Sequence, residues 1–177
     1  DTIYKETRKS MQQSYIEGEY ASTAPTSSTV RSLATTLPSF VTSIDSLSKS
    51  SITSSNLDNV KSLIENFVNY YNKVTKYSSD AKDSLSDDAS SKVDTINSIT
   101  NLYEDKLNDI GISINSDKTL SYTNADGSSA ISDDLTKLEN IFGSSSGYLG
   151  QIKNVSEELF KSIVSNNSDD VAIDFYA

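Results

Sequence analysis

A regular spacing of apolar side chains between residues 57 and 85 constrains the fold of this chain more than any other feature. The apolar residues recur every three or four positions, which is typical of an amphipathic α-helix with a heptad repeat. Ser78 fills the one position of the repeat that has no apolar side chain, and Ser55 is the expected N-cap. We call this set the first stripe, and its members are Leu57, Val60, Ile64, Phe67, Tyr71, Val74, Ala81 and Leu85.

A second stripe of the same period follows after a polar stretch from residue 78 to residue 91. A turn is expected near Ser86, Asp87 and Asp88, and Thr100 occupies the weak position of the second stripe. Two long helices joined by a short polar turn form an antiparallel hairpin. We therefore predict that the first stripe packs against the second stripe, whose members are Val93, Ile96, Tyr103, Leu107 and Ile110.

The spacing changes after Gly111 from a helical period to an alternation. Ile112 and Ile114 alternate with polar residues, residues 115–118 suit a turn, and Leu120 and Tyr122 alternate again. This pattern predicts a small β-hairpin. The expected fold is therefore mainly α, a long antiparallel helical hairpin or bundle with a small β-hairpin near residues 112–122.

The chain divides by composition into three parts. Residues 1–54 are predicted to be a helical segment rich in serine and threonine, in which Pro38 should kink or divide the helix. Residues 55–165 contain the helical hairpin, the β-hairpin and further helices with apolar spacing from Ile131 and from Leu149. Residues 166–177 are predicted to be a tail.

Composition argues against several functional classes. The net charge of −10 disfavours binding to the phosphates of nucleic acids. Because the chain has no histidine and no cysteine, histidine-dependent catalytic triads and the usual zinc sites are excluded. No stretch approaches the roughly 20 apolar residues that span a bilayer. We expect no enzyme activity, no catalytic residues, no cofactor and no transmembrane segment.

Two weaker motifs are better explained as structure. Residues 124–127 (Asn-Ala-Asp-Gly) resemble part of a calcium loop, but Tyr122 would occupy its first ligand position, so a turn is expected and no metal is inferred. The many aromatic residues suit a carbohydrate-binding surface, yet most lie on the stripes and are predicted to pack. Tyr70, Tyr77 and Tyr148 lie off the stripes and are the aromatic residues expected to be exposed.

Three short segments between residues 57 and 165 resemble the C-terminal region of the flagellar hook-associated, filament-capping protein family. Residues 67–72 (Phe-Val-Asn-Tyr-Tyr-Asn) resemble that family's Phe-Val-x-x-Tyr-Asn segment. Residues 107–121 are similar to its Leu-x-x-Ile-Gly-Ile, turn, Thr-Leu stretch, and residues 135–142 with 147–150 to its ending. The family's large β-rich domains have no counterpart here, where residues 1–54 stand in their place.

The resemblance implies a secreted bacterial protein with a structural or assembly role at the end of a flagellar filament. Its partners would be proteins, either further copies of itself or flagellar filament subunits, contacted through helices. A secreted monomeric binding module is the alternative, such as an adhesin or a chaperone-like accessory that holds an apolar helix of its partner. The oligomeric state of the purified chain distinguishes these two hypotheses.

Overall fold

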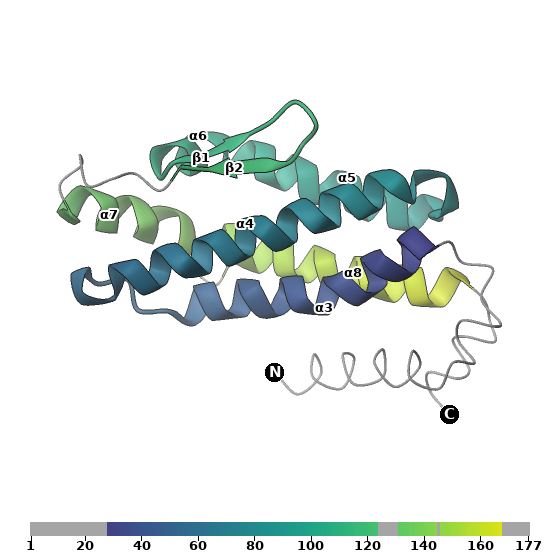
Figure 1. Cartoon of the computed structure of the whole chain (residues 1–177), viewed down its shortest axis with the longest axis horizontal. Coiled ribbons are helices and arrows are strands. Elements are labelled where there is room, and N and C mark those ends of the chain that lie inside the picture. Colours follow the sequence, from purple (N-terminus) through teal and green to yellow (C-terminus); the bar gives the residue numbers. More distant parts are fainter. Residues whose placement is uncertain (1–27, 124–130, 145, 168–177) are drawn as a thin grey trace.

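The computed structural model describes residues 28–123, 131–144 and 146–167, which form a helical bundle with a small β-hairpin on one side (Figure 1). The predicted fold class, mainly α with a small β-hairpin, is confirmed. The helices are α3 (Ser28–Lys49), α4 (Leu57–Asp80), α5 (Asp87–Leu102), α6 (Glu104–Asp109), α7 (Ile131–Phe142) and α8 (Tyr148–Asn167). Short 3-10 helices, η1 (Ser54–Asn56) and η2 (Lys82–Ser84), flank α4, and the strands are β1 (Ile112–Ile114) and β2 (Leu120–Tyr122).

The four long helices pack in a different order from the one that the stripes predicted. α4 packs most extensively against α3, α8 packs against both α3 and α5, and α4 and α5 touch only sparsely. The prediction that the first stripe packs mainly against the second is therefore wrong. A periodic pattern shows which face of a helix is buried, but not which neighbour buries it.

The apolar face of α3 is the main packing partner of α4. Its side chains Leu33, Leu37, Phe40 and Leu47 are each at most 1% exposed and belong to the same core cluster as those of α4 and α8. Pro38 lies inside α3 without dividing the helix. Residues 28–49 therefore share one core with the body of the bundle, and residues 1–27 lie outside the part of the chain that is described.

Local signals set most of the helix ends. The predicted turn between α4 and α5 is present, and the Ser86 hydroxyl accepts a hydrogen bond from the Ala89 N–H at 3.1 Å, which caps α5. The predicted N-cap at Ser55 is wrong, because Ser55 lies within η1 and Asn56 immediately precedes α4. The second of the two predicted long helices is interrupted at Tyr103, which separates α5 from α6.

The β-hairpin has the predicted position. β1 and β2 pair antiparallel, with Ile112 opposite Tyr122 and Ile114 opposite Leu120. The Asn115 N–H donates to the Thr119 carbonyl at 2.8 Å and closes the turn, in which Lys118 has a positive φ of 73°. Gly111 has φ +89°, and a Cβ there would lie 2.4 Å from the Thr123 carbonyl oxygen, so only glycine fits at the start of β1.

Candidate functional site

The residues that were predicted to make contacts lie inside the chain's own core. Eight of the thirteen stripe residues are buried, and the other five are partly buried and pack against the same cluster: Leu57, Leu85, Val93, Tyr103 and Ile110. A surface free to bind a partner would leave such side chains open to solvent. The stripes therefore form the core of this chain, and their eight buried members are Val60, Ile64, Phe67, Tyr71, Val74, Ala81, Ile96 and Leu107.

Aromatic rings pack closely at the centre of this core. Phe67 stacks on Phe40 of α3 with ring centroids 5.6 Å apart, and it meets Tyr148 of α8 edge-on at 6.1 Å. Tyr71 lies 6.0 Å from both phenylalanine rings. Offset and edge-on contacts of this kind are the favourable geometries for aromatic pairs. The ring cluster thus joins α3, α4 and α8.

A chain of three hydroxyl groups crosses the same core. The Tyr71 hydroxyl donates to Thr100 Oγ1 at 3.0 Å, and Thr100 Oγ1 lies 2.9 Å from the Tyr148 hydroxyl oxygen. Burial raises the pKa of Tyr71 to about 12, and the hydrogen bond with Thr100 opposes part of this rise. Burial also raises the pKa of Tyr148 well above its ordinary value. Both phenols therefore stay protonated at neutral pH and act as structural hydrogen-bonding groups.

The expectation that Tyr148 is exposed is wrong. Its side chain is 0% exposed, because Thr100 of α5 supplies a buried partner for its hydroxyl group. Tyr70 and Tyr77 are partly buried against the core cluster, and the Lys73 ammonium lies 5.1 Å from the centre of the Tyr70 ring. The spacing of residues along one helix does not show which residue of another helix will be its partner. The one hint in the sequence was Thr100, a polar residue in the apolar second stripe, which is the partner of Tyr148.

Asn72 fixes the β-hairpin onto α4. Its side-chain Nδ2 donates to the Leu120 carbonyl at 2.9 Å, and its Oδ1 accepts from the Leu120 N–H at 2.7 Å. The amide thus pairs with the outer edge of β2 as a neighbouring strand would. Leu120 itself is 3% exposed. This contact places the turn of the hairpin next to the end of α4.

An open cleft of about 500 Å³ lies between the ends of α4 and α5 and the hairpin turn. Small side chains line it from both helices, Ser78 and Ser79 on α4 and Ser90 on α5. Ser78 is 4% exposed, and its Oγ has no hydrogen-bond partner. The gap in the first stripe thus lies at the wall of a cleft.

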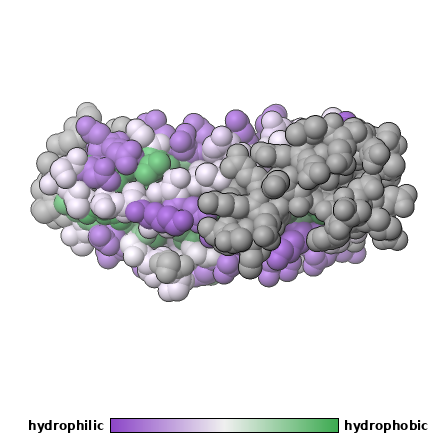
Figure 2. Space-filling model, turned by 90° about the horizontal axis from the view of Figure 1, so that it is seen from below, coloured by the Kyte–Doolittle hydropathy of each residue, from purple (hydrophilic) through white to green (hydrophobic). Residues whose placement is uncertain are grey.

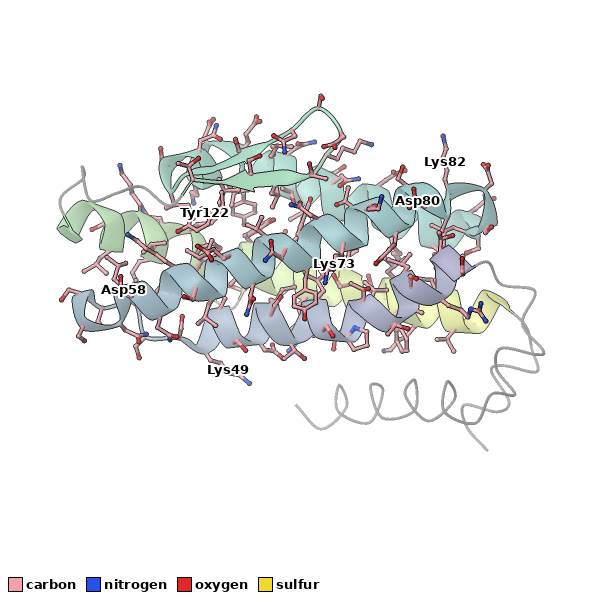
Figure 3. All side chains as sticks on the ribbon, viewed as in Figure 1. Lys49, Asp58, Lys73, Asp80, Lys82 and Tyr122 are labelled. Atoms are coloured by element: carbon pink, nitrogen blue, oxygen red, sulfur yellow. The ribbon has the colours of Figure 1, made fainter. Side chains whose placement is uncertain are left out.

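Charged groups of both signs surround this cleft. Lys82 and Lys118 line it together with Asp94 and Asp117. Figure 3 shows Lys82 projecting on the side of the bundle that carries the hairpin. The Thr119 hydroxyl and N–H donate to Asp117 Oδ1 and lower the pKa of this carboxyl group, so Asp117 stays ionised at neutral pH. The cleft therefore offers cations and anions as well as hydroxyl groups.

Apart from the cleft, the described surface has few groups that indicate a binding site. Among the described residues, Leu102 is the exposed large apolar side chain, at 81%. Where the face in Figure 2 is coloured, hydrophobic areas are narrow and lie between hydrophilic ones. In residues 28–123, 131–144 and 146–167, no three metal-ligating side chains gather, and no helix is long and apolar enough to cross a membrane. Residues 124–127, considered above as a calcium loop, lie outside these ranges.

Comparisons of the chain with protein-family models, with characterised proteins and with solved structures find no match.

Proposed function

We propose that this chain is a non-enzymatic structural protein that works by contact with other protein subunits, in an assembly role like that of the filament-capping family. The proposal includes export from a bacterial cell, since the family's members act outside it. Without histidine and cysteine, the chain lacks the side chains that most often supply nucleophilic and acid–base catalysis. What remains is a rigid helical body whose outer surface is available for contacts.

One observation carries this proposal: the three segments that resemble the family meet in space. Asn72 of the first segment binds Leu120 of the second through two hydrogen bonds. Phe67 of the first segment packs against Tyr148 of the third, with ring centroids 6.1 Å apart. The three segments thus belong to one packed unit of the fold. Their convergence supports a shared structural unit, and with it the shared role.

Contacts with partners would have to use the outer surface, because the stripes are buried. Leu102, at the end of α5, is the best candidate anchor, since it is the exposed large apolar side chain among the described residues, at 81%. Its neighbour Asn101 is also exposed but polar, and provides a matched control position.

The test measures binding of the purified chain to itself and to flagellar filaments. We expect light scattering to show a concentration-dependent oligomer, or sedimentation to show the chain bound to filaments. Leu102→Ser should weaken this association, whereas Asn101→Ser should not, and both variants should keep the helical circular dichroism spectrum. A chain that stays monomeric and does not bind filaments would contradict the assembly role.

A monomeric binding module is the second candidate, and the burial of the stripes favours it. The described part of the chain buries most of its large apolar side chains in its own core, as expected of a protein that is stable as a monomer. A chaperone-like grip on an apolar helix has little support, because the cleft is lined mainly by polar residues. Such a module would bind a polar partner. A strict monomer in light scattering, together with saturable binding of a polar ligand, would favour this candidate.

A further inference from the structure

The cleft between α4, α5 and the hairpin turn has the size of a ligand site. Its volume of about 500 Å³ lies within the range of roughly 300 to 1,000 Å³ that is usual for small-molecule sites. It is bounded by three elements whose relative positions are fixed, α4 and α5 by the capped turn at Ser86 and the hairpin by Asn72. The main chain around the cleft is therefore preformed, which lowers the ordering cost of binding.

The four charged groups around the cleft have no ion partners of their own. Lys82, Asp94, Asp117 and Lys118 are all exposed, and within the described part of the chain none of them forms an ion pair. Two cations and two anions around one opening give a lining of no net charge, in a chain whose overall charge is −10. This arrangement favours a ligand that carries both an anionic and a cationic group.

The uncharged lining agrees with a small polar ligand. Thr75, Ser90 and Asn97 contribute hydroxyl and amide groups, and Ser78 contributes an Oγ that has no partner in the folded chain. None of the described residues that line the cleft is aromatic, so the stacking surface that sugars commonly use is missing. Leu85 and Val93 add a limited apolar area.

We propose that this cleft binds a small zwitterion of the amino-acid or short-peptide class, with its carboxylate near Lys82 and Lys118 and its ammonium group near Asp94 and Asp117. The site does not depend on the assembly role, because no residue that lines it belongs to the Leu102 region. The same chemistry is offered by a free amino acid and by a short peptide with free ends.

Nuclear magnetic resonance titration of the ¹⁵N-labelled full chain tests the site with three probes: glycine, glycylglycine and N-acetylglycylglycine amide. We expect saturable shifts of the amide signals of Ser78, Asp94 and Lys118 with at least one of the two zwitterions. The capped dipeptide, which has no charge, should bind at least about tenfold more weakly, a loss of about 1.4 kcal/mol. Binding of glycine alone would identify free amino acids, and binding of glycylglycine alone would identify peptides.

Variants separate a built site from weak general binding. The double variant Lys82→Gln/Lys118→Gln should weaken the zwitterion by about tenfold or more, as the loss of charge-assisted contacts predicts. Lys49→Gln is the matched control, because Lys49 is an exposed lysine on the opposite side of the bundle (Figure 3). Both changes are at exposed side chains and should leave the fold intact.

Three results would overturn the proposal. One is the absence of saturable shifts with both zwitterions. A second is equal binding of glycylglycine to the double variant and to the Lys49→Gln control. A third variant, Ser78→Val, removes the unpartnered hydroxyl group and places a larger apolar side chain in the cleft. It should weaken the shifts while the spectrum of the rest of the chain stays folded, and unchanged binding to it is the third result.

Discussion

Asn72 of α4 and Leu120 of β2 are joined by two hydrogen bonds, in which the side-chain amide of one pairs with both main-chain groups of the other. The two residues are 48 positions apart in the chain. Because β2 is a short edge strand in a two-stranded sheet, this pairing replaces the neighbouring strand that a larger sheet would provide. The hairpin is therefore part of the helical body.

Replacing Asn72 should loosen the hairpin. Asn72→Asp removes the Nδ2 donor and turns an attractive contact with the Leu120 carbonyl into a repulsive one. We expect a loss of about 1–3 kcal/mol in the free energy of unfolding, measured by urea denaturation, and faster hydrogen exchange in β2. Asn69→Asp, at an exposed position on the same helix, should change the stability little. Equal effects of the two variants would show that the pairing contributes nothing.

The hydroxyl group of Thr100 should matter more than its size. Thr100→Val keeps the shape but leaves the phenols of Tyr71 and Tyr148 without their shared partner, at a cost of about 1–3 kcal/mol for each buried group left unpaired. Thr100→Ser keeps the hydroxyl and should cost less, mainly through a lost methyl group. Urea denaturation of the two variants checks this order. A valine variant as stable as the serine variant would contradict the role of the network.

The free energy of unfolding should fall at high pH, because Tyr71 loses its proton at a lower pH in the unfolded chain than in the folded chain. Its folded pKa is about 12 against an ordinary value of 10.0, so between these values the folded state holds more protons than the unfolded state. Stability is therefore full below pH 10 and declines from there toward pH 12, by at most about 1.4 kcal/mol per pH unit for this group. Burial also raises the pKa of Tyr148, which contributes to the decline in the same range. Tyr71→Phe should therefore make the decline shallower without removing it, in urea unfolding measured from pH 8 to 11.5, and an unchanged slope would contradict the assignment.

Ser156 carries a buried hydroxyl group that has no partner, and its side chain is 0% exposed. Ser156→Ala removes this unsatisfied group and introduces the best helix former, so stability should rise by about 1 kcal/mol. Ser43→Ala is the control: its Oγ donates to the Phe40 carbonyl at 2.7 Å, so removing it brings no such relief. Thermal unfolding of both variants measures the difference, and a destabilised Ser156→Ala would refute the prediction.

The sequence predicted the elements of this fold better than their partners. Alternation at Ile112 and Ile114 was sufficient to place the β-hairpin, since strand periodicity is a local property. The helix that packs on the first stripe could not be predicted from periodicity. The apolar face that contains Phe67 can pack equally well on α3 or on α5. Hydrophobic contacts carry no direction, so packing geometry decides between equivalent faces.

The roles of the polar residues within the stripes could not be predicted from the spacing alone. Thr100 and Ser78 both interrupt an apolar pattern, yet Thr100 binds two buried phenols and Ser78 borders the cleft. Their roles depend on residues of other helices, such as Tyr148. Likewise, periodicity does not distinguish Asn72, which holds the hairpin, from its exposed neighbour Asn69. The resemblance does, because Asn72 is a fixed position of the Phe-Val-x-x-Tyr-Asn segment and Asn69 is not.

The central claim is that the first stripe forms the core of this chain and is not an open surface for partners. The double variant Phe67→Ser/Tyr71→Ser tests it most directly by far-ultraviolet circular dichroism and urea unfolding, with Asn66→Ser/Asn69→Ser on the same helix as control. Each core change alone should cost about 3–5 kcal/mol, against a total stability of about 5–15 kcal/mol for a typical domain. We predict that the core variant loses its helical signal or its cooperative transition while the control keeps both. A helical, cooperatively folded core variant that had lost only its association with partners would contradict the claim.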